Sequence, residues 1–175
     1  MKPFVVCFTG ISGSGKSTLA NAVADALKEK PLPLQIIDGD VLRSELGNLF
    51  GYTREERMKQ NQIVKVVAKY LLRQEVNVLI SIVAPYDEMR KGMRAFFGES
   101  FCLVYVKCPS EICAKRDVKG YYRLSKEHQM RHLNGVNDIY EVPEDAELTL
   151  DTSQLSLDTC VERILAYLRE RKYAV

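Results

Sequence analysis

The sequence predicts an α/β fold in which helices cover both faces of a five-stranded parallel sheet, and three observations lead to it. Short apolar runs alternate with helix-like stretches along the chain. The runs are almost continuously apolar, as expected of strands that are buried on both faces. A glycine-rich loop separates the first run from the first helix-like stretch. We therefore expect three layers, α/β/α.

The expected strands are the apolar runs. They lie at residues 4–8, 34–37, 76–83 and 101–106, with a weaker candidate at 148–150. The clearest helix begins at Thr53, because Thr53 and Glu56 form a capping-box pattern. Its expected core-facing stripe consists of Met58, Ile63, Val66, Val67, Tyr70 and Leu71. A last helix near 157–171 should pack across the sheet.

Size and charge limit the classes of function. The 175 residues, 46% of them hydrophobic, suffice for one core, so we expect one domain spanning 1–175. The net charge is only +2, so no overall basic field indicates nucleic acid or an anionic membrane as a partner. No apolar run approaches the roughly 20 residues that cross a bilayer, and the glycine-rich loop begins at Gly10, too early for a cleavable signal. A cytoplasmic location is expected.

The five cysteines are odd in number and include no C-x-x-C pair. This pattern fits neither a disulfide framework nor a structural zinc site. Because Cys7 and Cys102 lie inside expected strands, we expect small buried thiols.

The strongest functional signal is the segment 10–18, which reads GISGSGKST and contains the complete pattern G-x-x-x-x-G-K-[ST]. It follows an expected strand and opens an expected helix, which is the setting of a phosphate-binding P-loop and makes a chance glycine-rich turn the weaker interpretation. In such a loop backbone N–H groups surround phosphate oxygens, Lys16 bridges the outer phosphates and the Ser17 hydroxyl can hold Mg²⁺. We assign nucleoside-triphosphate binding to Gly10, Ser12, Gly13, Ser14, Gly15, Lys16, Ser17 and Thr18.

A second polar group follows the second expected strand, with Asp38, Asp40 and Arg43 in the pattern D-G-D-x-x-R. Open parallel sheets bind ligands beyond the carboxyl ends of their strands, so both carboxylates should face the phosphates. One can accept a proton from an attacking hydroxyl, and the other can help Ser17 to hold Mg²⁺, directly or through water. Arg43 could then grip an anionic acceptor in a two-pronged way. The alternative is an Asp-Gly turn with a helix N-cap at Asp40.

The third expected strand ends in Ala84-Pro85-Tyr86 rather than in an aspartate. The carboxylate that usually supports the metal ion at this place in P-loop proteins is therefore missing. We expect Asp38 and Asp40 to replace it.

The segment 115–131 carries six basic residues against two acidic ones, a local balance of +4. Its position after the fourth strand suggests a helical lid, approximately residues 115–140, that closes over both substrates and excludes water. We expect Lys119 to contact the acceptor and Arg116 the nucleotide. An ordinary solvated helix surface is the alternative.

Two histidines in the same segment, His128 and His132, are four residues apart and would share one face of a helix. A metal site is disfavoured because no glutamate follows the first histidine and no third ligand is evident. We expect solvated lid histidines.

With these motifs in this order, the chain resembles the adenylylsulfate (APS) kinase family over nearly its whole length. The matching features are residues 10–18, the D-G-D-x-x-R element, Gly51-Tyr52 before Arg57, Ala84-Pro85-Tyr86, Arg116-Asp117 with Lys119-Gly120 and Tyr122, and Tyr140-Glu141 with Pro143-Glu144.

The resemblance implies a P-loop kinase fold, Mg·ATP as donor, and transfer of the γ-phosphoryl group to the 3′-hydroxyl of adenylylsulfate in sulfate assimilation. It gives Asp38 the role of the base, with Asp40 supporting the metal and acceptor site. Members of the family commonly form dimers. The acceptor contacts that it implies are Asp38, Asp40, Arg43, Tyr52, Arg57, Gln60, Asn61, Val83, Ala84, Lys119 and Leu133.

The departures from the family pattern gather where the acceptor should bind, while the donor side is intact. Gln60, with Asn61 beside it, stands where the family usually has an Asn. Leu133 stands where the family has a Phe that would stack on an adenine. The other replaced elements are Ile82-Val83-Ala84-Pro85 for Phe-Ile-Ser-Pro, Arg123-Leu124-Ser125-Lys126 for Lys-Lys-Ala-Arg, and Asn134-Gly135-Val136-Asn137 for Thr-Gly-Ile-Asp.

Two interpretations of these departures stay open. Ordinary divergence within APS kinases is favoured, because the basic residues at 43, 57 and 119 still supply anion contacts. The other is a relative that phosphorylates the 3′-hydroxyl of a different nucleotide, such as cytidine diphosphoramidate in capsule modification. The amides of Gln60, Asn134 and Asn137 would then hydrogen-bond its base or headgroup.

A nucleotide-dependent switch or hydrolase is a third class. The guanine-reading pattern N-K-x-D that it would need is absent from the sequence. The single D-x-x-G match, from Asp117 to Gly120, belongs to the lid rather than to the end of the third strand. This class is therefore disfavoured.

Overall fold

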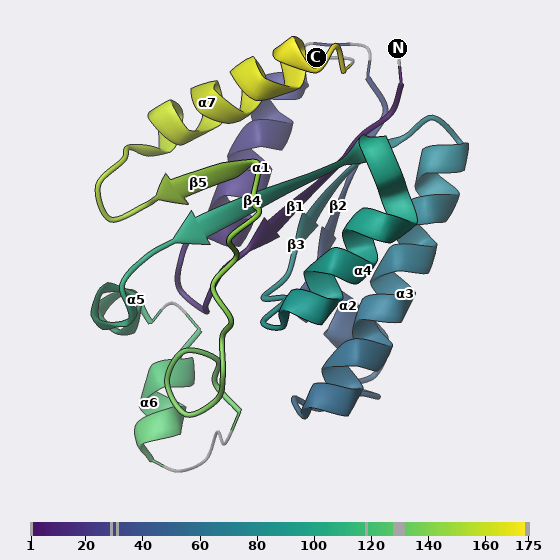
Figure 1. The fold of residues 1–175 in the computed structure, drawn as a ribbon. Coiled ribbons are helices and arrows are strands. Elements are labelled where there is room, and N and C mark those ends of the chain that lie inside the picture. The colour runs from purple at the N-terminus through teal and green to yellow at the C-terminus, as the bar shows by residue number, and fades with distance from the viewer. Residues whose placement is uncertain (1, 29, 31, 118, 128–131, 174–175) are drawn as a thin grey trace.

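The five expected strands form one parallel sheet. The computed structural model describes residues 2–28, 30, 32–117, 119–127 and 132–173 (Figure 1). The strand order is β2-β3-β1-β4-β5. The strands are β1 (Val5–Thr9), β2 (Leu34–Asp38), β3 (Asn77–Ser81), β4 (Phe101–Lys107) and β5 (Leu148–Asp151). The third strand is shorter than the expected 76–83, because the chain leaves the sheet after Ser81 to form the turn into the next helix.

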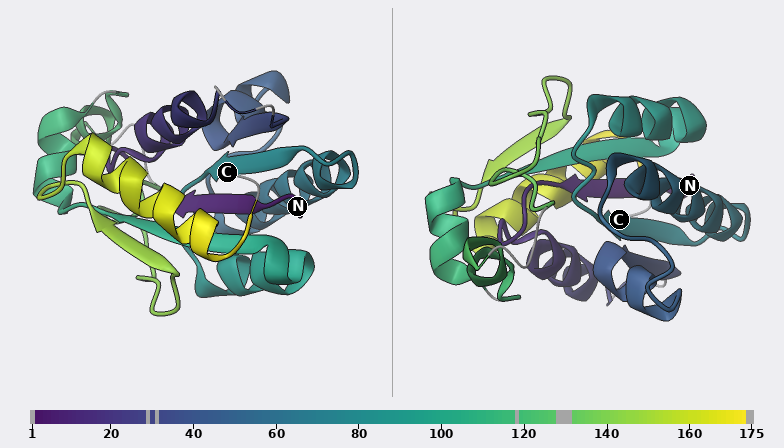
Figure 2. Two further views of the ribbon diagram at one scale, coloured as in Figure 1. Left: turned by 90° about the horizontal axis from the view of Figure 1, so that it is seen from above. Right: turned by 90° about the horizontal axis from the view of Figure 1, so that it is seen from below.

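The helices lie on both faces of this sheet (Figures 1 and 2). Helices α1 and α7 pack together against one face, and α3 and α4 pack together against the other. Their bounds, with those of the shorter helices, are α1 (Lys16–Leu27), α2 (Gly39–Glu45), α3 (Arg54–Arg73), α4 (Asp87–Phe97), the 3-10 helix η1 (Gly98–Ser100), α5 (Ser110–Arg116), α6 (Tyr121–Lys126) and α7 (Leu157–Glu170). The expected three-layer α/β/α arrangement is confirmed.

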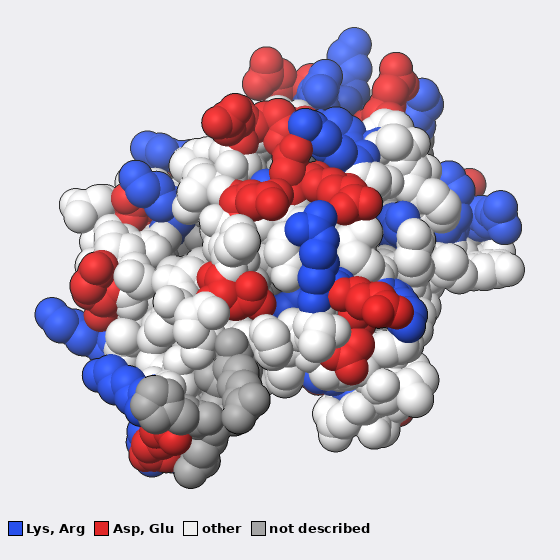
Figure 3. Space-filling model, turned by 60° about the horizontal axis from the view of Figure 1, so that its bottom comes forward, with Lys and Arg blue, Asp and Glu red and all other residues white. Residues whose placement is uncertain are grey.

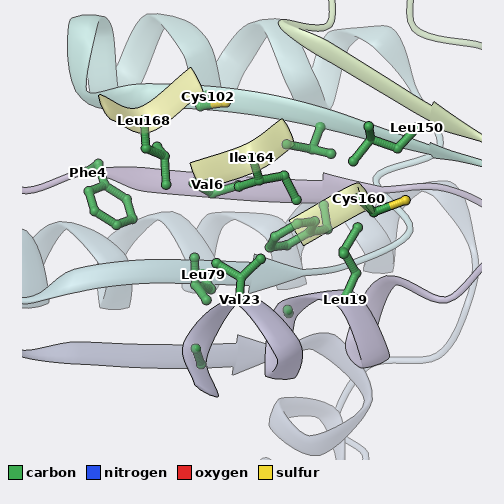
Figure 4. Packing of buried hydrophobic residues seen from close by; sticks show 14 of the residues in the cluster. Phe4, Val6, Leu19, Val23, Leu79, Cys102, Leu150, Cys160, Ile164 and Leu168 are labelled. Atoms are coloured by element: carbon green, nitrogen blue, oxygen red, sulfur yellow. The ribbon is translucent and has the colours of Figure 1, made fainter. Parts of the chain in front are cut away.

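Alternation along β1 explains why the strand is apolar throughout. Val6 and Phe8 point into the cluster formed with α1 and α7, while Val5 and Cys7 point into the cluster formed with α3 and α4. All four side chains have no solvent exposure. Figure 4 shows the first cluster, in which side chains of α1 and α7 meet above the sheet. Burial on both faces therefore requires the continuous hydrophobic run that predicts the strand.

Helix α3 begins at the expected N-cap, but half of its predicted buried stripe is wrong, while Leu71 packs against the core as expected. Thr53 and Glu56 form the reciprocal capping box. Val66 and Tyr70, assigned to the core face, are 48% and 63% exposed. The residues that the helix buries are Arg57, Gln60, Asn61, Val64, Lys65 and Ala68. The N-terminal half of α3 faces the cavity and buries polar residues there. The C-terminal half buries Val64 and Ala68 in the core, a face next to the one that carries Val66 and Tyr70, so apolar periodicity selects the wrong face.

The predictions for the last helix and for the cysteines are confirmed. Helix α7 spans nearly the expected 157–171 and buries Cys160, Ile164 and Leu168. All five cysteines are buried and free. Among the described residues no helix is long and apolar enough to cross a membrane. Basic and acidic side chains are interspersed over the described part of the face in Figure 3, in agreement with the net charge of +2.

Candidate functional site

A cavity of about 480 Å³ opens beyond the carboxyl ends of the central strands. The P-loop forms one end of it, and the end of β2, helices α2 and α3, the turn after β3 and the segment around α6 form the rest. Every residue that the sequence assigns to the site lines this cavity except Gly10 and Ser14. The structure therefore brings the candidate donor and acceptor residues together in one space.

The P-loop needs its glycines for backbone conformation and close packing. Gly13 and Gly15 have φ angles of +78° and +98°, in the left-handed region that favours glycine. A Cβ atom at Gly10 would collide with the Val106 carbonyl oxygen. Gly15 is the N-cap of α1, and no side chain caps the helix, so the N–H groups of its first turn are open to an anion. Gly10 and the fully buried Ser14 belong to the loop but do not line the cavity.

Lys16 is a buried lysine in the first turn of α1. Its Nζ donates a hydrogen bond to the Ile11 carbonyl oxygen at 2.8 Å, and only 9% of the residue is exposed. Burial, and then the nearby charge of Lys119, lower the pKa of Lys16 to about 8, against the opposing effect of Asp40 and Asp38. The loop thus holds a cation that is poorly solvated and gains strongly from an anionic ligand.

Three side-chain oxygen atoms lie close together where α1 begins and where β2 and β3 end. They belong to Ser17, Asp38 and Ser81. The Ser17 hydroxyl donates to Asp38 Oδ2 at 2.6 Å and lies 3.1 Å from the Ser81 hydroxyl oxygen. Asp38 and Ser81 are direct neighbours in the β2–β3 register. Sequence reasoning missed Ser81. The signal for it was its place at the end of the third strand, where a carboxylate was noted as missing.

The N-cap of α2 is Asp38, not Asp40 as the alternative from sequence had it. Asp38 Oδ1 accepts hydrogen bonds from the backbone N–H groups of Asp40 and Val41, at 2.9 and 3.4 Å. Burial alone would raise the pKa of Asp38, but the hydrogen bonds from Ser17 and from these amides, with the charge of Lys119, lower it below its ordinary value. Asp38 is therefore held as a carboxylate, with Oδ2 on the cavity side beside Ser17.

The donor atoms at this place fit a magnesium ion. Ser17 and Asp38 supply a hydroxyl and a carboxylate oxygen, the hard ligands that Mg²⁺ prefers, and phosphate oxygens would complete its shell. Within the described residues no group of three or more His, Cys, Asp or Glu could hold a metal ion without such a ligand. Of the two histidines that we expect to be solvated lid residues, His128 lies outside the described residues. Nδ1 of His132 lies 3.5 Å from Asp138 Oδ2.

Arg43 lines the acceptor side of the cavity, and its guanidinium hydrogen-bonds to other groups of the protein. Its Nη1 donates to the carbonyl oxygens of Phe50 and Gly51, and its Nη2 donates to Gln60 Oε1. The opposite end of the Gln60 amide donates to the Gly39 carbonyl at 2.8 Å. Arg43 and Gln60 thus join α2, α3 and the loop between them, while Arg43 Nε is buried without a partner among the described residues. Asn61, 4% exposed beside Gln60, has a side-chain oxygen without a partner among the described residues.

Tyr52 lies between two arginines. The guanidinium carbons of Arg43 and Arg57 stand 4.4 and 5.2 Å from the centre of its ring. Arg57 Nε donates to the Tyr52 carbonyl, and Nη2 donates to the His132 carbonyl, both at 2.9 Å. Arg57 therefore ties the segment after α6 to α3, and the pair of buried cations gives this end of the cavity its positive character.

The turn after β3 brings Val83 and Ala84 to the cavity. Thr9 Oγ1 donates to the Val83 carbonyl at 2.6 Å, and Arg90 Nη1 donates to the Ala84 carbonyl at 2.8 Å. Ala84 has a φ of +41°, a strained conformation for an alanine, so these hydrogen bonds hold a backbone shape that the chain would otherwise avoid. Sequence reasoning missed Thr9 and Arg90, since neither belongs to a motif.

The basic segment after β4 lies over the cavity and contacts both of its ends. Lys119 Nζ forms an ion pair with Asp40 on the acceptor side. Arg116 Nη2 donates to the Thr152 carbonyl at 2.9 Å, and Arg116 Nη1 lies 3.4 Å from the Gly13 carbonyl of the P-loop. Thr152 Oγ1 in turn donates to the Ser14 carbonyl at 2.8 Å. Thr152, which follows β5, is a further site residue that sequence reasoning missed.

Asn134 and Asn137, offered as readers of another base, are engaged within the protein. Asn134 Nδ2 donates to the Ile139 carbonyl at 2.6 Å, and its side-chain oxygen is buried without a partner among the described residues. Asn137 Nδ2 donates to Ser125 Oγ at 2.9 Å, and its Oδ1 accepts from the Leu133 N–H at 2.7 Å. Leu133 itself is 3% exposed and belongs to a small apolar cluster beneath the P-loop.

Comparisons with known proteins agree on one family. The family model described as adenylylsulphate kinase matches residues 2–151. The adenylyl-sulfate kinase of Synechococcus sp. (strain JA-2-3B'a(2-13)) is 38% identical, over 96% of this chain and 95% of that protein. The enzyme of the same name from Clostridium acetobutylicum is 36% identical, over 98% of this chain and 86% of that protein.

A solved structure of the Mycobacterium tuberculosis APS kinase CysC, in complex with AMPPNP and APS, has a similar fold. It superposes with a TM-score of 0.91 at 29% identity and covers 96% of this chain and 98% of its own. Family match, full-length relatives and fold all agree with the motifs and the cavity. The chain belongs to the adenylylsulfate kinase family.

Proposed function

We propose that the protein transfers the γ-phosphoryl group of ATP to the 3′-hydroxyl of adenylylsulfate. The observation that carries the proposal is the single cavity, with a triphosphate-binding loop at one end and buried arginines, a tyrosine and a carboxylate at the other. Relatives of similar length carry the name adenylyl-sulfate kinase. Both substrates would meet at Asp38, Lys16 and Ser17, the residues where the two ends join.

Each of these residues has a role that follows from its position. Asp38 Oδ2 would accept the proton of the 3′-hydroxyl while the oxygen forms its bond to the γ-phosphorus and the bond to the bridging oxygen of ADP breaks. Lys16 and the amides of the P-loop would neutralise charge that develops on the transferred group and on ADP. Mg²⁺ bound with ATP neutralises phosphate charge, and Ser17 would hold it with Asp38 or Asp40, directly or through water.

The segment 115–140 would act as a lid in this reaction. Lys119 and Arg116 already contact opposite ends of the cavity. Closure of the segment would exclude water, so that a hydroxyl group rather than water receives the phosphoryl group. We further propose that the protein acts in the cytoplasm and forms a homodimer. Its partner would be a free nucleotide rather than a nucleic acid.

The cytidine diphosphoramidate alternative is not favoured. It needed the amides of Gln60, Asn134 and Asn137 to bind a different base or headgroup. All three already hydrogen-bond within the protein, and only the side-chain oxygen of Asn134 has no partner among the described residues. Replacing those bonds would leave Arg43 and the segment around Leu133 without their partners, at a cost of about 1–3 kcal/mol for each buried group left unpaired.

ATP-dependent phosphoryl transfer by the purified protein tests the proposal. The assay compares adenylylsulfate, cytidine diphosphoramidate and a blank without acceptor, each with Mg²⁺. We expect turnover of adenylylsulfate to its 3′-phosphorylated form and little loss of ATP in the blank. Turnover of the cytidine compound alone would overturn the choice of acceptor, and equal loss of ATP in the blank would overturn the assignment as a kinase.

ATP binding should weaken above about pH 8 because of Lys16. In the free protein its pKa is lowered to about 8, whereas the phosphates of a bound nucleotide favour the charged lysine and raise that pKa. Binding above pH 8 must therefore take up a proton, and the affinity should fall by up to about tenfold for each further pH unit. Titration calorimetry with AMPPNP at pH 8.5, in buffers of different ionisation enthalpy, measures that uptake. A heat that does not depend on the buffer would contradict the prediction, and Lys16→Ala is the control that should abolish the uptake.

A further inference from the structure

Tyr121 and Tyr122, the first two residues of α6, contact different ends of the cavity. The Tyr122 hydroxyl donates to the Ser12 carbonyl of the P-loop at 2.8 Å, on the donor side. Tyr121 interacts instead with Tyr52, Asp40 and Arg43, which are all acceptor-side residues. Successive residues of a helix point about 100° apart, so one short helix presents an aromatic side chain to each side.

The position of Tyr121 is fixed by contacts on both sides of it in the chain. The Asp117 carboxylate accepts hydrogen bonds from the N–H groups of Tyr122 and Arg123, both at 3.0 Å, and anchors the start of α6. Lys119, two residues before Tyr121, pairs with Asp40 across the cavity. The Tyr121 ring itself packs against the apolar cluster that contains Leu133. Tyr121 therefore packs against apolar side chains where it lines the cavity, rather than standing in free solvent.

Among the tyrosines of the cavity, Tyr121 is the one whose ring is neither fully buried nor covered by a cation of the described chain, although its hydroxyl hydrogen-bonds with Tyr52. The tyrosines that line the cavity are Tyr52, Tyr121 and Tyr122, and none of the phenylalanines does so in the described chain. The ring of Tyr52 is occupied by Arg43 and Arg57. Tyr122 is 5% exposed and lies in the cluster beneath the P-loop. Tyr121 is half-buried, with no cation against its ring among the described residues.

We propose that the ring of Tyr121 contacts the base of the acceptor nucleotide and contributes to its recognition. The inference rests on the proposed function and names a residue that binds the base of its acceptor. A base has two broad apolar faces that gain from contact with an aromatic ring, whichever polar groups it carries. Leu133, in the same cluster, has no aromatic face to offer, and two arginines occupy the ring of Tyr52, so Tyr121 supplies the aromatic face that is left for a base.

Steady-state kinetics of Tyr121→Ala and Tyr121→Phe test the proposal. Tyr121→Ala should raise the KM for adenylylsulfate about 10- to 100-fold, since stacking on a base is lost. Its kcat and its KM for ATP should stay within about twofold of the wild type, because the donor side keeps Tyr122 and Arg116. Tyr121→Phe keeps the ring and should retain most of the affinity. Tyr70→Ala, at an exposed tyrosine of α3 outside the cavity, is the matched control and should behave as the wild type.

A base-free acceptor separates contact with the base from a structural role in the lid. The loss caused by Tyr121→Ala should be large for adenylylsulfate and disappear for ribose 5-phosphosulfate, which has no base to stack. An equal loss with both acceptors, or a parallel rise in the KM for ATP, would show that Tyr121 only supports the lid and would overturn the inference.

The two proposals fail in different ways. A wild-type protein that does not phosphorylate adenylylsulfate overturns the proposed function and this inference with it. A wild-type protein that does so, with an unchanged KM for adenylylsulfate in Tyr121→Ala, overturns the inference alone.

Discussion

Replacement of Lys16 by alanine is expected to lower kcat for phosphoryl transfer at least about 10³-fold. Lys16 is the cation of the P-loop, and its low exposure means that water cannot replace its charge. The loss should fall on the transition state, where charge develops on the transferred group and on ADP. Steady-state kinetics with saturating ATP and adenylylsulfate measure the effect. Thermal unfolding should change little, because the Lys16 side chain makes a single hydrogen bond, to Ile11.

Lys28→Ala is the matched control for this variant. Lys28 caps the other end of α1, pairs with Asp25 at the surface and is outside the cavity. Exposed pairs of this kind contribute little to stability, so the variant should keep the wild-type kcat. Near-normal turnover by Lys16→Ala would contradict the assignment of the loop as the ATP-binding site.

Substitution of Asp38 by asparagine should lower kcat about 10²- to 10⁴-fold, the usual contribution of a general base. The fold should survive, since asparagine is as good an N-cap as aspartate and its oxygen can still accept the hydrogen bond from the Asp40 N–H. The KM for adenylylsulfate should change much less than kcat. Unaltered turnover in Asp38→Asn would refute the assignment of Asp38 as the base.

The dependence of Asp38→Asn on Mg²⁺ distinguishes the base from a metal ligand. If Asp38 served mainly to hold the ion beside Ser17, a higher Mg²⁺ concentration should restore activity. We expect no such rescue for Asp38→Asn and a partial rescue for Ser17→Ala, which removes a hydroxyl ligand but leaves the carboxylate. Asp158→Asn, in the exposed first turn of α7, controls for the change of charge and should leave kcat unaltered.

The predictions from sequence that the structure confirms depend on local pattern. Apolar runs and their spacing locate the strands, because a strand that is buried on both faces leaves no room for polar residues. The capping box at Thr53 fixes the start of α3 through contacts within one turn. The segment 10–18 forms its loop because glycines at 13 and 15 allow left-handed backbone conformations.

The prediction for the buried face of α3 failed for a reason that the sequence could not reveal. Apolar periodicity identifies the core face only when the helix packs against the core along its whole length. The first half of α3 packs against the cavity instead, so Arg57 and Gln60 are buried there, and the second half buries Val64 in the core and leaves Val66 exposed. Tertiary position overrides the pattern.

The hydrogen-bond partners of the site residues could not be predicted from the sequence either. Ser14 and Thr152 are 138 residues apart in the chain. They meet because only β4 lies between β1 and β5 in the sheet, so the loops that follow β1 and β5 are close together. Ser81 joins Ser17 and Asp38 only because β3 lies between β1 and β2. Arg43 lines the acceptor end as expected, yet its guanidinium binds carbonyl oxygens that follow α2.

The sequence by itself determined the phosphate loop, the D-G-D-x-x-R element and most of the other groups that line the cavity, but not Ser81 or Thr152. Short-range rules suffice for that, since phosphate loops, caps and buried strands are specified within a few residues. Only the tertiary structure decided which groups are paired and which remain free for a ligand. Pairing depends on side chains from distant elements that compete for the same hydrogen bonds and charges, and that competition is settled by the order of the strands and the packing of α2, α3 and α6 around them.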